Sequence, residues 1–235
     1  MYRDNPFAVR AHFRRSLVLT YSCPIEVATR LLAPGLTLDT WSGHAFLAVA
    51  MVQTEHLRPA FLAQPFGRDF FLAGYRLFVR HGSQRGLLIL RSDTDRLSMV
   101  RLGNVFTHYH YRLCSFDLSA RPGATLWRVD TPDSEADLEI VEREQAALPP
   151  ASVFTSEREA RRYAGPLPVT FGYDSASRAL ISVRGVRANW SPRLVGVDVR
   201  RSTWMPEGAR LASAFAIQDV AYRWQRGVRI GLEAA

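Results

Sequence analysis

The segment Thr107 to Phe116 contains the residues best suited to chemistry. If it forms a strand, His108 and His110 share one face and Tyr109 lies on the other, because side chains alternate along a strand. Two imidazoles at this spacing can bind one metal ion, such as zinc, iron or copper. We favour the simpler hypothesis of a face without metal, either exposed to solvent or lining a polar cavity. The candidates for a third metal ligand are Glu55, His44 and Asp93.

Arg76 is the second candidate for binding chemistry. It lies in the stretch Tyr75 to Arg80, where arginine and apolar residues alternate as expected for a strand with two different faces. A guanidinium on a face that looks into the fold could hold a carboxylate or a phosphate through two hydrogen bonds. The alternative is a structural ion pair with Asp93 or Asp95, and the sequence leaves both hypotheses open.

No residue is assigned a catalytic role. The chain lacks the nucleophile motif G-x-S-x-G, the zinc motif H-E-x-x-H and both glycine-rich phosphate-binding motifs. The sequence therefore predicts binding side chains and leaves open whether the protein is an enzyme; neither a metal nor a cofactor is predicted. The predicted ligand-binding residues are Arg76, His108, His110, Tyr109, Arg101 and Glu55.

The composition restricts the chemistry further. All 30 basic residues are arginine, and the formal net charge is +8. Without lysine no side chain can form a Schiff base with a carbonyl substrate. The two cysteines, Cys23 and Cys114, are too few for a disulfide framework and are expected to be buried thiols.

The elements that must position these residues are mostly strands. Alternating or continuous apolar runs predict strands at 11–21, 44–54, 75–80, 107–116, 124–130, 169–173 and 179–186, with more toward the C-terminus. Glycines in the segment 81–86 predict a hairpin. We expect one domain covering residues 1–235, of the α+β class and predominantly antiparallel, with about ten to twelve strands and two or three short helices.

Helices and loops are predicted from local signals. Ser156 followed by Glu159 is typical of a capping box, and Ser92 or Thr94 could cap a helix that buries Leu97, Val100 and Leu102. The apolar loop 56–68 is expected to lie against the body of the protein. The longest uncharged apolar run, 45–52, is far shorter than the ~20 residues that cross a bilayer. We therefore expect a cytoplasmic protein without a membrane partner.

Several segments together resemble a known family. They are Tyr75-Arg76 with Gly86 after the hairpin, Leu90-Arg91-Ser92-Asp93 entering a helix, Arg101 leading to Tyr109, and the helix from Thr155 to Tyr163. In this order and spacing the chain resembles the YqjF-like family of uncharacterised bacterial proteins. The resemblance implies a fold similar to acetoacetate decarboxylase, with a curved sheet closed into a barrel or cone around a cavity. Those decarboxylases use a lysine imine, so this chain is expected to share the scaffold and lack the reaction.

Three functions agree with these observations. The first, which we favour, is a protein that binds a small, partly apolar organic acid in a cavity lined by Arg76, Tyr109 and the His108/His110 face. The second is a nucleic-acid or acidic-partner module, suggested by ten arginines against five acidic residues after Gly165. It is the less favoured, because those arginines are spread out. The third is an interaction protein whose loop 56–67 contacts another copy of the chain.

Overall fold

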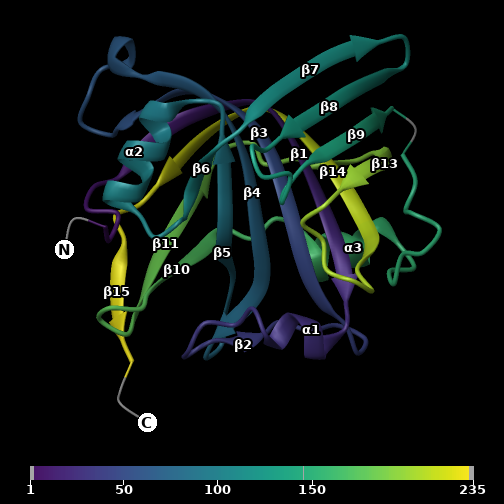
Figure 1. The fold of residues 1–235 in the computed structure, drawn as a ribbon, viewed down its shortest axis with the longest axis horizontal. Coiled ribbons are helices and arrows are strands. Elements are labelled where there is room, and N and C mark those ends of the chain that lie inside the picture. The colour runs from purple at the N-terminus through teal and green to yellow at the C-terminus, as the bar shows by residue number, and fades with distance from the viewer. Residues whose placement is uncertain (1–2, 145, 233–235) are drawn as a thin grey trace.

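The computed structural model describes residues 3–144 and 146–232, and its main feature is a large curved sheet (Figure 1). Its strands are β1 (Val9–Cys23), β2 (Thr37–Leu38), β3 (Ala45–Pro59), β4 (Arg68–His81), β5 (Gln84–Thr94), β6 (Tyr111–Leu113), β10 (Val169–Asp174), β11 (Ala179–Arg187), β12 (Arg193–Leu194), β14 (Arg210–Trp224) and β15 (Val228–Gly231). The main path runs β12-β14-β1-β3-β4-β5-β10-β11-β15. A further pairing between β11 and β14 turns this path into a ring. The fold is therefore mostly antiparallel β, as predicted.

A second sheet packs on one face of the first. It consists of β7 (Ser115–Arg121), β8 (Ala124–Asp130), β9 (Leu138–Arg143) and β13 (Gly196–Ser202), in the order β13-β9-β8-β7. Trp127 on β8 is fully buried between the sheets, and its Nε1 donates a hydrogen bond of 2.8 Å to the carboxylate of Glu142. Arg15 on β1 donates to the same carboxylate at 2.9 Å. This charge-assisted contact joins the two sheets.

The two faces of the large sheet have different neighbours. One face packs on the second sheet and carries Val49 and Met51 of β3. The other packs on helix α3 (Glu157–Ala164) and carries Ala48 and Ala50. We call these the second-sheet face and the α3 face. Because β3 is buried on both sides from Ala45 to Val52, its sequence is a continuous apolar run, and the strand predicted there is confirmed.

The helices are short. They are α1 (Ile25–Thr29), α2 (Leu97–Phe106), α3 and the single 3₁₀ turn η1 (Gln64–Phe66). The predicted cap of α3 is confirmed at Ser156, whose Oγ accepts from the Glu159 amide at 3.3 Å, while the Glu159 carboxylate accepts from the amide of the preceding Thr155 at 2.9 Å. Within residues 3–144 and 146–232, no helix has the length and apolar character to cross a lipid bilayer.

Two predictions about α2 are wrong. The helix begins at Leu97 after Arg96, and no side chain caps it. Its buried residues are Met99 and Gly103, while Leu97 is 50% exposed. A Cβ on Gly103 would collide with the ring of Tyr111, so the helix rests on β6 through this glycine. The contact with β6, which the sequence did not reveal, decides which side of α2 is buried.

The apolar loop after β3 also differs from its prediction. Phe61 and Phe66 are 74% and 69% exposed, so they do not cover the body of the protein. Phe61 contacts Phe7, with ring centroids 6.1 Å apart. That another copy of the chain covers this loop stays a prediction.

Candidate functional site

Arg76 lies on the α3 face of β4, on the face opposite its neighbour Tyr75. It pairs directly with Ala48 of β3, and Gly74 precedes it on the same face. A Cβ on Gly74 would lie 3.1 Å from Nη2 and 3.2 Å from Nε of Arg76, so the guanidinium folds back over this glycine. Small residues around Arg76 therefore make room for its head group on an otherwise apolar surface.

The guanidinium of Arg76 has no anionic partner among the described residues. Its Nε is buried and has no hydrogen-bond partner, and no ion pair in this part of the chain involves it. The predicted ion pair with Asp93 or Asp95 is therefore wrong: Asp93 pairs with Arg91 at 2.9 Å, and the Asp95 carboxylate accepts from the Phe71 amide. Burial lowers the pKa of Arg76, because a charge without a partner is costly away from water.

Three tyrosines lie within electrostatic reach of this guanidinium. Tyr222, Tyr109 and Tyr111 all lie close enough to Arg76 to influence its pKa. Tyr222 belongs to β14, which is separated from β4 by β1 and β3, so the α3 face is concave here. Burial raises the pKa of Tyr109 to about 12 and also raises that of Tyr111 and Tyr222. All three hydroxyls are therefore neutral near pH 7 and able to donate to an anion.

Packing holds these tyrosines in place. The Tyr109 and Thr170 hydroxyls form a hydrogen bond of 3.0 Å. Tyr222 stacks on Phe13 with ring centroids 4.7 Å apart, and its hydroxyl reaches the space that a side chain at Gly185 would occupy. These contacts restrict the positions of the Tyr109 and Tyr222 rings, which favours a preorganised site.

Arg187 places a second cation near this cluster. Both of its Nη atoms donate to the carbonyl of Pro166, at 3.1 and 3.2 Å, and its guanidinium lies 3.9 Å from the ring centroid of Trp190. Burial lowers the pKa of Arg187, and the charge of Arg76 lowers it further. The cluster therefore combines two guanidiniums with neutral hydroxyls, an arrangement that favours an anion.

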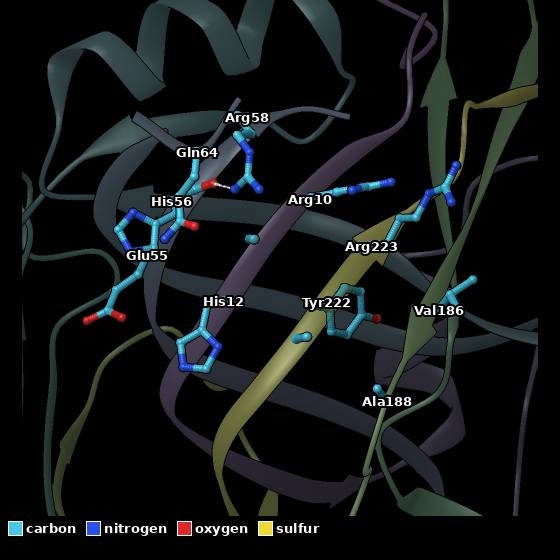
Figure 2. Close-up of a pocket in the computed structure, with 12 residues that line it drawn as sticks. Arg10, His12, Glu55, His56, Arg58, Gln64, Val186, Ala188, Tyr222 and Arg223 are labelled. Atoms are coloured by element: carbon cyan, nitrogen blue, oxygen red, sulfur yellow. Dashed lines mark hydrogen bonds between the residues drawn. The ribbon is translucent and has the colours of Figure 1, made fainter. Parts of the chain in front are cut away.

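A groove of about 560 Å³ is lined in part by Tyr222 of this cluster (Figure 2). Tyr222 belongs to both, because it lines the groove and lies near Arg76. The groove crosses β3, β1, β14 and β11 and has a partly apolar lining that includes alanines. Its charged and polar residues are Arg10, His12, Glu55, His56, Arg58, Gln64 and Arg223.

The predicted site residues are only partly brought together. Tyr109 and Arg76 are near enough for each to influence the pKa of the other. Glu55 lies in the groove, 3.4 Å from Arg14, and Arg101 lies on the exposed side of α2. The ligand roles of these residues stay predictions.

The predicted strand 107–116 is wrong in its first half. His110 has a positive φ of 53° and is exposed, whereas His108 is buried with its Nε2 3.6 Å from the Asp4 carboxylate. The cause is Asn104, whose amide both donates to and accepts from the backbone of Tyr111 at 2.9 Å. That contact bends the chain before β6, so the two histidines do not share a strand face.

The described residues contain no group of three histidine, cysteine, aspartate or glutamate side chains arranged for a metal ion. Tyr222 and Arg187 were missed as site residues. For Tyr222 a weak signal existed, since it follows the alternation of a strand near the C-terminus. For Arg187 no sequence signal exists, because its position depends on the pairing of β11 with β14.

Comparison with known proteins adds family and fold. The family model described as DUF2071, uncharacterized conserved protein, matches residues 10–214. A search of curated protein sequences found no match.

Solved structures show the fold. Acetoacetate decarboxylase from Legionella pneumophila is 10% identical, with a TM-score of 0.69 over 96% of this chain and 88% of that one. An acetoacetate decarboxylase-like enzyme from Sphingomonas wittichii RW1 is 12% identical, with a TM-score of 0.60 over 98% and 94%. The enduracididine biosynthesis enzyme MppR, complexed with pyruvate, is 11% identical, with a TM-score of 0.62 over 95% and 90%. At such identities the likeness concerns the fold alone.

Proposed function

This chain belongs to the DUF2071 family, and from that premise we propose that it binds a small organic acid through Arg76 on the concave α3 face. The observation that carries the proposal is a partly buried guanidinium whose Nε has no acceptor among the described residues, within electrostatic reach of neutral tyrosine hydroxyls. A carboxylate would take two hydrogen bonds from Arg76 and one from a hydroxyl such as that of Tyr109. The YqjF-like assignment within the family is part of the same proposal.

The proposed ligand is partly apolar. Ala48, Phe13 and Trp224 lie on the α3 face in the same core cluster, so the surroundings of the carboxylate are mainly hydrocarbon. Pyruvate is bound by MppR, which shares the fold, and it has the required chemistry of a short acid with a small body. It is therefore the first ligand to test.

No imine chemistry is included in the proposal. The chain contains no lysine, so the nucleophile of acetoacetate decarboxylases has no counterpart among its side chains. Binding of the acid is the proposed activity. No residue of the site is assigned a role in a reaction of the bound acid.

The proposal is tested by thermal unfolding with a library of short carboxylates that includes pyruvate. Wild type should be stabilised by at least one acid, and Arg76→Gln should weaken that binding by about 10- to 100-fold, as expected for loss of a charged hydrogen-bond donor. Arg112→Gln is the matched control, because Arg112 is half exposed on β6 and pairs with Glu135 at 2.9 Å. The proposal fails if no acid stabilises wild type, or if both variants respond like wild type.

The aromatic residues of the arginine-rich C-terminal segment pack into the fold, which argues against the nucleic-acid alternative. Trp190, Tyr222 and Trp224 pack against the core cluster of the α3 face, and Arg187 covers Trp190. Aromatic rings packed in this way are less open to stacking with bases than exposed rings. We therefore propose the small acid in preference to a nucleic acid.

A further inference from the structure

Three arginines form a row across neighbouring strands in the groove. Arg10 of β1 is directly opposite Arg58 of β3 on one side and Arg223 of β14 on the other. Figure 2 shows the three side chains on adjacent strands, with Val186 of β11 beyond them. Directly opposite residues of an antiparallel pair lie on the same face about 4.5–5.5 Å apart at Cβ. The row therefore concentrates three positive charges on one surface.

This row lacks a counter-charge within the described part of the chain. Arg58 donates to the carbonyls of Leu62 and His56, at 3.2 and 2.9 Å, and no ion pair among the described residues involves Arg10, Arg58 or Arg223. Like charges directly opposite one another destabilise a sheet. The repulsion is not compensated within residues 3–144 and 146–232, so an external anion would relieve it.

The acidic residues nearest the row are already engaged. Glu55 lies 3.4 Å from Arg14, and Asp219 lies 3.5 Å from Nε2 of His12. Both lie near His12 on β1, which is two residues along the strand from Arg10 of the arginine row. They leave the three guanidiniums without an anionic partner in the described part of the chain and would repel an anion that extended past them.

We propose that this groove binds a small phosphorylated molecule with at least two linked phosphate groups. Adjacent strands are about 4.8 Å apart, so the row spans on the order of 10 Å, which suits a short chain of phosphates better than a single carboxylate. The groove volume of about 560 Å³ is that of a small-molecule site. A nucleic-acid backbone would need a longer basic track, whereas this row ends at Val186.

The experiment is titration calorimetry with tripolyphosphate, using orthophosphate as the single-anion comparison. Wild type should bind tripolyphosphate saturably and more tightly than orthophosphate. Arg10→Gln, in the middle of the row, should weaken tripolyphosphate binding by at least about tenfold. Removing one of three like charges should not impair folding, which the melting temperature of the variant checks.

Two further variants distinguish binding in this groove from binding elsewhere on the protein. Arg121→Gln removes the same charge from an exposed arginine on β7 of the second sheet and should leave binding unchanged. Arg112→Gln, at a half-exposed arginine on β6 that pairs with Glu135, should also leave it unchanged. The inference is overturned if tripolyphosphate does not bind wild type, if orthophosphate binds equally well, or if Arg121→Gln or Arg112→Gln weakens binding as much as Arg10→Gln.

Discussion

Arg76 and Arg91 are two arginines withdrawn from solvent on neighbouring strands, and they differ in their partners. Arg91 on β5 faces the second sheet, where its Nε lies 2.9 and 3.0 Å from the two oxygens of Asp93 and its Nη1 lies 3.2 Å from Glu135. Arg76 on β4 faces α3 and has no anionic partner among the described residues. A buried guanidinium that is fully paired belongs to the fold, whereas one without a partner marks a place for a ligand.

The strongest test of this comparison is Arg91→Ala. It would leave the fully buried carboxylate of Asp93 without its main partner, which typically costs about 3–5 kcal/mol of stability. Urea unfolding at pH 7 measures this loss. A change below about 1 kcal/mol would show that Arg91 is no more structural than Arg76.

The second test uses pH. Burial raises the pKa of Asp93 to about 6, against the opposing effect of Arg91. Because the folded state then holds this proton more tightly than the unfolded state, whose carboxyl has a pKa near 3.9, stability falls as pH rises from about 4 to 6. The fall should reach up to about 3 kcal/mol and be absent in Asp93→Asn. Parallel pH profiles of the two proteins would contradict this.

The third test is Arg76→Leu, which is expected to act in the opposite direction to Arg91→Ala. Removing a buried donor without an acceptor should raise the free energy of unfolding by about 1–2 kcal/mol. Urea unfolding without ligand measures the gain. A loss similar to that of Arg91→Ala would mean that Arg76 has a structural partner and would end the distinction between the two sites.

Much of the difference between Arg76 and Arg91 could not be predicted from the sequence. The alternation around Tyr75 correctly placed Arg76 on the face opposite Tyr75, because the pleat is a local property. Its isolation depends on a register shift between Tyr75 and Arg76 in the pairing with β5, together with the position of Arg91 opposite Tyr75. A bulge of this kind leaves no sequence signal and decides which face Asp93 occupies.

Predictions from local sequence patterns were right for the cap of α3. They were wrong for residues 107–110, where a side chain takes the hydrogen bonds that a neighbouring strand would otherwise make. The α3 capping box was predicted because all its contacts lie within four residues. The His108/His110 pair was mispredicted because Asn104 binds the backbone of Tyr111 and ends the alternation. Tyr222 comes near Arg76 because the pairing of β11 with β14 closes the ring of strands. No pattern within one strand predicts that pairing.

The closure of the ring also sets when the site can exist during synthesis. The pairing of β11 with β14 involves only Gly185 to Arg187 and Tyr222 to Trp224. A ribosome that has released the chain only as far as β13 has provided Arg76 and its immediate strands, and Tyr222 is still to come. The site around Arg76 therefore lacks Tyr222 until β14 has emerged and paired with β1 and β11.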